Sequence, residues 1–395
     1  MYSLLRGIRV LEVALLAPDA LGQHLADLGA EVIKVEEPPN GDYVRLVGYQ
    51  HLGGLSLMHL RWNRGKKSVL LNLKAPEGRD VFLELARRSQ VVIDGLRAGA
   101  VDRFGIGYEA VRAVNPKIVY CSLSGLGQSG PYRDLPTHGL TYDAMTGLAP
   151  PVIAADGYPR IPDGTIGVGT QLAPLYAAMG VLAALVRSVQ TGQGQHIDVA
   201  QADAAFAWRA GTVETVMNGL PGGGSVSMAP AVRYQYYGTK DGRFIIFMAS
   251  ERKFWKKFCE AVDRMDLYET KPGAEVGEHA RGDEDLRHEL AKIFQTRTQR
   301  EWVQIFVDEN VPGGPVHENA DFIHDPHFQS RGNILEQDHP QAGRVTMAST
   351  PIKLPGETFE AGPAPSPGEH TDEVLASVLG YAGEAIAGLK KRGVI

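Results

Sequence analysis

The sequence is poor in cysteine, in positive charge and in long apolar runs, and each shortage excludes a class of protein. Only two of its 395 residues are cysteines, Cys121 and Cys259, and neither belongs to a CxxC pair. This argues against a disulfide framework or a thiolate zinc site and suits a reducing cytoplasm. The formal net charge of −6 leaves no basic face for nucleic acid. No apolar run reaches the ~18 residues that a membrane helix needs.

The GxGxxG spacing of dinucleotide-binding turns is also missing after the first predicted strand, which disfavours a standard dinucleotide site. That strand covers 7–15, a helix follows at 17–28, and a second strand covers 30–36. Strand, helix and strand within about 30 residues form a parallel crossover unit. The sequence therefore predicts an α/β fold with a doubly wound parallel sheet.

The alternation of strands and helices continues along the chain. Predicted strands at 68–73, 91–94, 118–123 and 192–200 alternate with predicted helices at 76–88, 110–114, 170–186 and 201–217. The helix at 170–186 is apolar nearly all round, so we expect it to be buried. The strand at 118–123 ends in a loop with Gly125, Gly127 and Gly130, where backbone amides can approach a ligand closely.

Three consecutive glycines, Gly222, Gly223 and Gly224, break this pattern and act either as a linker or as a mobile lid. A smaller α+β unit follows, with a hairpin at 234–248 and helices at 252–262, 285–294 and 300–308. The chain is longer than one core usually supports. We therefore expect a large domain over 1–220, a small domain over 225–330 and a C-terminal segment over 331–395.

Several short motifs are more specific than composition. They read Leu28-Gly-Ala-Glu-Val-Ile-Lys-Val-Glu-Glu-Pro38, Asn63-Arg-Gly-Lys-Lys-Ser68, Ser124-Gly-Leu-Gly-Gln-Ser-Gly-Pro-Tyr132, Thr191-Gly-Gln-Gly-Gln-His-Ile-Asp198, Asp325-Pro-His-Phe328 and Pro367-Gly-Glu-His-Thr-Asp-Glu-Val374. Their identity and order resemble the class III CoA-transferases of the CaiB/BaiF type. That family includes formyl-CoA transferase, carnitine CoA-transferase and α-methylacyl-CoA racemase.

The resemblance implies a large Rossmann-like domain built from both chain ends, a smaller inserted domain, and two subunits interlocked as rings. It also implies that CoA or acyl-CoA binds the large domain as substrate, without a metal. Carried over by motif, the CoA contacts would be Val35, Arg45, Leu71, Lys74, Leu96 and Arg103. The arginines suit this role because a guanidinium group binds phosphate through two hydrogen bonds. The glycines at 222–224 would form the loop that closes over the acyl thioester.

The nucleophile that the resemblance implies is missing. An aspartate that attacks the thioester is expected just before the buried helix, where this chain has Thr170, or Gly169 if the count slides by one residue. The carboxylate of Asp163 lies about seven residues too early and would need a shifted loop. His138 matches the base of the racemases, but those enzymes also need the missing aspartate, so packing within its loop is the favoured interpretation of His138.

The sequence departs from the family pattern at two further positions: Gly95 replaces an asparagine, and Gly139 stands where many relatives carry an acidic residue. These changes indicate that one chemical role is lost while the scaffold is kept. The chain resembles the Asp-less subunit of heteromeric members such as benzylsuccinate CoA-transferase, from anaerobic aromatic degradation. The sequence thus predicts a cytoplasmic subunit that moves CoA from an acyl-CoA such as succinyl-CoA to an acid such as an aryl- or alkylsuccinate. A paralogous partner would supply the aspartate. Two alternatives stay open: a self-sufficient racemase or isomerase that uses His138, and a non-catalytic CoA-binding subunit.

Overall fold

The chain divides into two units. The computed structural model describes residues 1–395 except 222–226, 276, 278 and 319. The large unit consists of Met1–Ala210 together with Gly332–Ile395, and the small unit is Gly211–Arg331. The small unit therefore begins at Gly211, earlier than the predicted end of the large domain at residue 220. It ends at Arg331, one residue after the predicted end of the small domain at residue 330.

A parallel six-stranded sheet forms the centre of the large unit. Its strands are β1 (Arg9–Ala14), β2 (Glu31–Glu36), β5 (Lys67–Leu70), β6 (Val91–Gly95), β7 (Val119–Ser124) and β10 (Gln195–Ala200). Their order across the sheet is β10-β7-β6-β1-β2-β5, and every neighbouring pair is parallel. This order reverses between β1 and β6, as in doubly wound Rossmann folds. The predicted fold class is confirmed.

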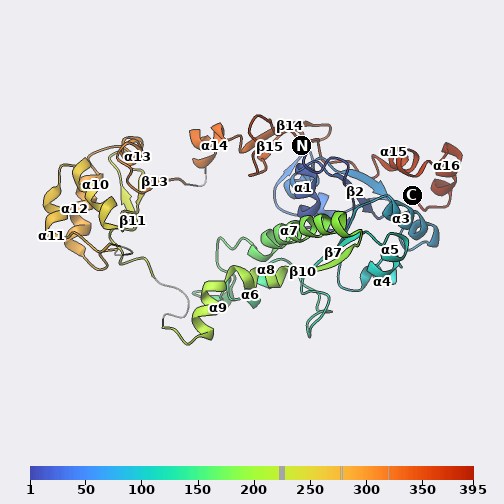
Figure 1. Ribbon diagram of the computed structural model, residues 1–395, viewed down its shortest axis with the longest axis horizontal. Helices are drawn as coiled ribbons and strands as arrows, with labels where there is room; N and C mark the ends of the chain where they lie inside the picture. The colour runs from blue at the N-terminus through green and yellow to red at the C-terminus, as the bar shows by residue number, and fades with distance from the viewer. Residues whose placement is uncertain (222–226, 276, 278, 319) are drawn as a thin grey trace. The chain divides into compact units, whose positions relative to one another are not determined.

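Helices cover both faces of this sheet, so its strands are apolar on both sides. Val10 packs with α1 (Asp19–Asp27), α7 (Val168–Thr191) and α8 (Gln201–Trp208), whereas Leu11 faces α3 (Pro76–Arg87) and α5 (Tyr108–Val114). The C-terminal α15 (Thr371–Val374), the π-helical turn η3 (Leu375–Leu379) and α16 (Gly383–Lys391) join the core on the α3 side (Figure 1). Both ends of the chain thus build one core.

Shorter elements complete the large unit, except that α9 begins at its residue Ala210 and continues into the small unit. They are η1 (Tyr43–Arg45), β3 (His51–Leu52), β4 (Leu55–Ser56), α2 (Leu57–Trp62), α4 (Ala100–Arg103), α6 (Leu140–Met145), β8 (Val152–Ile153), β9 (Pro159–Arg160), α9 (Ala210–Met217), β14 (Ile334–His339) and β15 (Gly343–Ala348). β3–β4, β8–β9 and β14–β15 are antiparallel pairs outside the central sheet.

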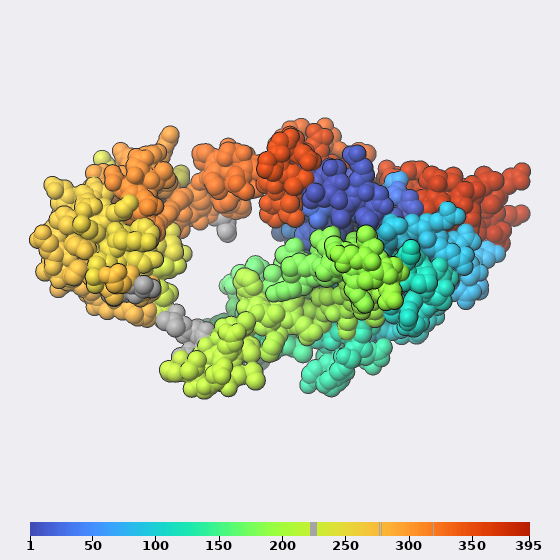
Figure 2. Space-filling model, in the orientation of Figure 1, coloured from blue at the N-terminus to red at the C-terminus, as the bar shows by residue number. Residues whose placement is uncertain are grey.

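Helix α7 is buried on one side only, which corrects the expectation that it is buried all round. Ala173, Ala177 and Val181 pack against β7 and β10. The opposite side, called the outer face of α7 here, is solvent-exposed; it consists of Leu175 (45% exposed), Met179 (58%), Val186 (58%) and Val189 (84%). Figure 2 shows α7 in green at the surface of the large unit. Length and composition alone would let this helix cross a membrane, but its inner side belongs to the core of the sheet.

The small unit has an antiparallel sheet in the order β11-β12-β13. Its elements are β11 (Gln235–Gly238), β12 (Phe244–Phe247), α10 (Arg252–Ala261), α11 (Met265–Thr270), α12 (Glu284–Phe294), α13 (Gln299–Asp308), β13 (Gly313–Val316), η2 (Phe322–His324) and α14 (Pro326–Ser330). Its core is largely aromatic, with Phe247, Trp255, Phe258, Phe294 and Trp302 in mutual contact. The expected hairpin and the three expected helices are present.

Candidate active site

Two adjoining cavities of about 330 Å³ each lie at the carboxyl ends of the parallel strands. The switch-point cavity is lined by residues from 15–18, 95–98, 123–126 and 133–142, together with Tyr43, Thr170 and Gln201. The β2–β5 cavity is lined by residues from 13–15, 35–37 and 71–74, together with Gly41, Tyr43, Leu96 and Phe104. Leu15, Tyr43 and Leu96 belong to both. Ligands of doubly wound folds bind where the strand order reverses, which is the place of the first cavity.

Four of the predicted CoA contacts line the β2–β5 cavity: Val35, Leu71, Lys74 and Leu96. They come from the ends of three different strands, and the parallel sheet brings those ends to one edge. Lys74 lies at the surface and pairs with Glu37 at 2.5 Å between Nζ and Oε1. This is an exposed contact that a phosphate can replace at little cost. The motif positions thus converge on one cavity.

The predicted CoA contact Arg45 lies elsewhere. Its side chain lines neither cavity and is only 6–7% exposed. Both terminal nitrogens donate to the carboxylate of Glu36, with Nη2 at 2.9 Å from Oε1. Although burial opposes it, the pairing with Arg45 lowers the pKa of Glu36. In this structure Arg45 therefore fixes the strand end next to the cavity and does not present its guanidinium group to a ligand.

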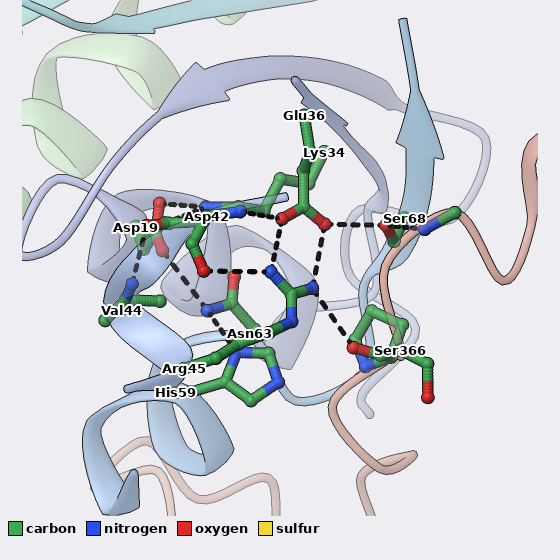
Figure 3. A network of polar contacts seen from close by, with 12 residues as sticks. Asp19, Lys34, Glu36, Asp42, Val44, Arg45, His59, Asn63, Ser68 and Ser366 are labelled. Atoms are coloured by element: carbon green, nitrogen blue, oxygen red, sulfur yellow. Dashed lines mark hydrogen bonds and ion pairs between the residues drawn. The ribbon is translucent and has the colours of Figure 1, made fainter. Parts of the chain in front are cut away.

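Arg45 is part of a buried charge network (Figure 3). Lys34 Nζ donates to Asp19, to Asp42 Oδ2 at 2.8 Å and to the carbonyl oxygen of Ala14 at 3.0 Å. Burial raises the pKa of Asp19 well above its usual value. Burial by itself would lower the pKa of Lys34, but the nearby carboxylates of Asp19 and Asp42 outweigh it and raise that pKa. The network joins the end of β1, the start of α1 and η1.

Sequence reasoning missed this network, although a signal was present. Lys34 and Glu36 alternate with apolar residues within a strand that is buried on both faces. Charged side chains are rarely fully buried unless they are paired. Such a strand therefore indicates buried partners, here Asp19, Asp42 and Arg45.

The position of the expected aspartate is occupied by Thr170. A Cβ on Gly169 would lie 2.6 Å from the carbonyl oxygen of Gln201, so that position has no room for a side chain. Thr170 lines the switch-point cavity, and its hydroxyl donates to the carbonyl oxygen of Gly167 at 2.6 Å. A threonine hydroxyl bound in this way is not a carboxylate nucleophile.

The other candidate catalytic residues are separated by the fold. His138 is exposed and lines the switch-point cavity, whereas Asp163 is exposed and lines neither cavity. No residue lining the switch-point cavity, as far as the chain is described, carries a carboxylate. At Gly95 a Cβ would lie 2.6 Å from the Cβ atoms of Ala14 and Pro18, so this position has no room for an asparagine side chain.

A second buried polar chain, which the sequence did not reveal, lies under Leu96. Asp94 Oδ1 accepts from the backbone N–H of Leu96 at 3.0 Å, and Ser122 Oγ lies 3.3 Å from Asp94 Oδ2. Ser122 Oγ also contacts His196 Nε2 at 3.0 Å. Burial raises the pKa of Asp94 to about 7. Asp94 thus orients the residue shared by both cavities.

The remaining predicted site residues are Arg103 and the three glycines. Arg103 is exposed on α4 near Gly99 and lines neither cavity. Gly222, Gly223 and Gly224 lie outside the described residues. Among the described residues, no group of three or more His, Cys, Asp or Glu side chains is placed to hold a metal ion.

The sequence matches the family model of CoA-transferase family III over residues 5–371. A succinyl-CoA–D-citramalate CoA-transferase of Chloroflexus aurantiacus is 32% identical over 98% of this chain and 97% of its own length. The beta subunit of a succinyl-CoA–L-malate CoA-transferase of the same organism is 30% identical over 99% of this chain and 98% of its own length. Human succinyl-CoA:glutarate CoA-transferase is 30% identical over 99% of this chain and 90% of its own length.

Solved structures show the same architecture. A CAIB/BAIF family protein from Brucella suis superposes with a TM-score of 0.75 at 27% identity, over 96% of this chain and 100% of that one. Rv3272 from Mycobacterium tuberculosis gives a TM-score of 0.77 at 28% identity, over 93% and 98%. The likeness therefore extends over both units.

Proposed function

The chain belongs to CoA-transferase family III and is a CoA-transferase, and we propose that it is the subunit without the nucleophile in a heteromeric enzyme. That enzyme moves CoA from an acyl-CoA such as succinyl-CoA to a second organic acid. A paralogous partner contributes the catalytic aspartate. The observation that carries the proposal is the absence of a carboxylate among the described residues of the switch-point cavity, with Thr170 at the position expected for it.

The transfer needs a carboxylate because CoA is carried from donor to acceptor as a thioester of that carboxylate, which forms through a mixed anhydride. The aspartate attacks the thioester carbonyl of the donor, the C–S bond breaks, and CoA thiolate leaves a mixed anhydride. The thiolate then attacks the aspartyl carbonyl, which releases the donor acid and leaves an aspartyl–CoA thioester. The acceptor carboxylate repeats the same two steps and departs as its CoA thioester. A threonine hydroxyl at this position would form an ester instead, which is a poorer acyl donor than the anhydride.

The acceptor that the relatives favour is a dicarboxylic acid. The three relatives described above are named for succinyl-CoA with citramalate, malate or glutarate. An aryl- or alkylsuccinate shares the second carboxylate of these acids. Arg97, Arg133 and His138 are the basic side chains among the described residues of the switch-point cavity and provide partners for acidic groups of the substrates.

Association with a second polypeptide is supported by two observations. One of the relatives is named as a beta subunit. The outer face of α7 exposes Leu175, Met179, Val186 and Val189, and exposed apolar patches of this kind mark protein interfaces. A ring-like interlocked arrangement of two subunits remains part of the proposal. The two cysteines are free and buried, which is compatible with the proposed cytoplasmic location.

The test is reconstitution. The chain is expressed alone and together with each paralogue encoded beside it, and transfer of CoA from succinyl-CoA to citramalate, malate, glutarate and benzylsuccinate is followed by chromatography of the thioesters. We expect turnover only in a mixture. Full turnover by the lone chain would overturn the subunit proposal, and CoA binding without turnover in every mixture would favour the non-catalytic alternative.

A racemase or isomerase is the second candidate because His138 lines the switch-point cavity and is solvent-accessible. A base at this place could remove the α-proton of an acyl-CoA. Deuterium incorporation from heavy water into a 2-methylacyl-CoA, lost in His138→Gln, would support this function. The same measurement gives no exchange if the chain acts in transfer alone.

A further inference from the structure

The small unit has a cavity of its own, of about 610 Å³, called the α13–α14 cavity here. It is lined by residues from 299–304, 315–317 and 321–327, together with Arg243. All of them belong to the small unit, and none lines either cavity of the large unit. The motif at 325–328, to which CoA transfer gives no role, contributes to the lining. The volume is that of a small-molecule site.

One wall of the α13–α14 cavity is fixed by Gln299, the first residue of α13. Gln299 is 6% exposed, and its Nε2 donates to the carbonyl oxygens of Phe244 at 2.6 Å and Val316 at 3.0 Å. Its backbone N–H donates to Asp241 Oδ1 at 3.1 Å. These bonds join α13 to β12 and β13, so this wall is built on the sheet of the small unit.

His317 and Asp325 fix a second part of the lining. His317 Nε2 lies 2.9 Å from Asp325 Oδ2, and Asp325 Oδ1 accepts from the backbone N–H of His327 at 2.8 Å. Although burial opposes it, the contacts with His327 and His317 lower the pKa of Asp325. Its carboxylate is therefore ionised, and Nε2 of His317 is the donor. Nδ1 of His317 is buried and has no hydrogen-bond partner among the described residues, where such an atom normally has one.

Two guanidinium groups complete the lining. Arg300 has no ion pair or side-chain hydrogen bond within the described part of the chain, and Arg243 reaches Asp321 only at 3.8 Å, in an exposed contact that stabilises little. His324 and His327 add two exposed imidazoles. These imidazoles do not make a metal site, because no three described His, Cys, Asp or Glu side chains are placed to hold an ion. Two weakly paired cations and an unfilled buried nitrogen favour an oxyanion with more than one charge.

We propose that the α13–α14 cavity is a second ligand site of this protein, which binds a small oxyanion of two or more charges through Arg300, Arg243 and His317. A dicarboxylate and a phosphate share the required chemistry, because each offers several oxygens to a planar guanidinium fork. His317 donates from Nδ1 when its ring is protonated. The inference does not rest on the proposed function, since it uses no group of CoA and no residue of the two cavities in the large unit.

The test is calorimetric titration of the full chain with glutarate and with inorganic phosphate. Pentanoate is the control ligand, because it has the carbon chain of glutarate but only one carboxylate. The variants are Arg300→Gln and Arg243→Gln. Arg331→Gln is the matched control, because Arg331 is an exposed arginine next to α14 that does not line the cavity.

We expect Arg300→Gln and Arg243→Gln each to weaken binding of the preferred dianion about tenfold or more, the loss expected for a hydrogen-bonded charge. Arg331→Gln should bind as the unmodified chain does, and pentanoate should bind more weakly than the preferred dianion. Tighter binding of glutarate would identify the ligand as a dicarboxylate, and tighter binding of phosphate would identify it as a phosphate.

Equal affinity in Arg300→Gln, Arg243→Gln and Arg331→Gln would overturn the inference, because any bound anion would then lie elsewhere. So would pentanoate binding as tight as that of the preferred dianion, and so would the lack of saturable binding of both glutarate and phosphate. None of these results decides whether the chain takes part in CoA transfer, which the reconstitution assay measures separately.

Discussion

Asp143 and Gly169 are joined by a hydrogen bond of 3.0 Å from the backbone N–H of Gly169 to Asp143 Oδ1. The other carboxylate oxygen accepts from the N–H of Val168 at 2.7 Å, and Asp143 is 1% exposed. The first N–H groups of a helix have no partner within it, and a carboxylate there also complements the helix dipole. Asp143 thus determines where α7 begins and which way its first turn presents Thr170.

Asp143→Ala should therefore destabilise the large unit. Two buried N–H groups lose their partner, and we expect the free energy of unfolding to fall by about 2–3 kcal/mol in urea titrations. Asp143→Asn retains one acceptor oxygen and should lose less. Asp156→Ala is the control, because Asp156 is exposed in the turn between β8 and β9 and should change stability by under ~0.5 kcal/mol. Equal stability of the Asp143 and Asp156 variants would contradict this assignment.

Thr170→Asp should restore a nucleophile to the switch-point cavity. If the missing carboxylate is what prevents the lone chain from turning over, the variant will form a covalent CoA adduct with succinyl-CoA, seen in the intact mass. Thr170→Asn has the same shape without the charge and should form none. Gly169→Asp should lose stability, because its Cβ would lie 2.6 Å from the oxygen of Gln201. An adduct in the asparagine variant would show that another residue reacts.

The central sheet could be predicted because each of its strands is a short apolar run between helix signals. Val10 and Leu11 illustrate this, since they face opposite helical layers and must both be apolar. The extent of burial of α7 could not be predicted in the same way. The sequence shows that Val189 is apolar, but it does not show whether residues of the same chain cover the outer face of α7 on which Val189 lies.

The candidate site was predictable where it depends on strand ends and not where it depends on side-chain direction. Val35, Leu71 and Leu96 follow three parallel strands, so their convergence follows from topology. Arg45 was expected at a phosphate, but Glu36 lies close enough to take both of its nitrogens.

Lys34→Met should be strongly destabilising. The change leaves the carboxylates of Asp19 and Asp42 buried without their cation, a loss that typically amounts to about 3–5 kcal/mol. Lys390→Met is the control, because its ion pair with Asp372 is more than half exposed and contributes little. The comparison is made by chemical denaturation of both variants. If the two lose equal stability, the buried network does not support the fold as described.

Asp94 should make stability depend on pH. Burial raises the pKa of Asp94 to about 7 in the folded chain, whereas an unfolded aspartate has a pKa of ~3.9. Between these two pKa values the folded state holds a proton that the unfolded state has released. The free energy of unfolding therefore falls as pH rises, by up to ~1.4 kcal/mol per pH unit, and levels off above pH about 7. Asp94→Asn should flatten this slope in unfolding titrations between pH 5 and 8. A variant with the unmodified slope would refute the assignment.

The outer face of α7 should control association. Met179→Glu combined with Val186→Glu places two charges on a side that is already exposed within the large unit, so the fold of the single chain should survive. If a second polypeptide covers this face, burying unpaired charges there costs several kcal/mol and the complex should dissociate. Light scattering of the chain alone and mixed with its paralogue measures this directly. The control is Val307→Glu on α13, which is 70% exposed in the small unit. If the α7 double variant keeps the mass of the unmodified complex, another surface holds the subunits together.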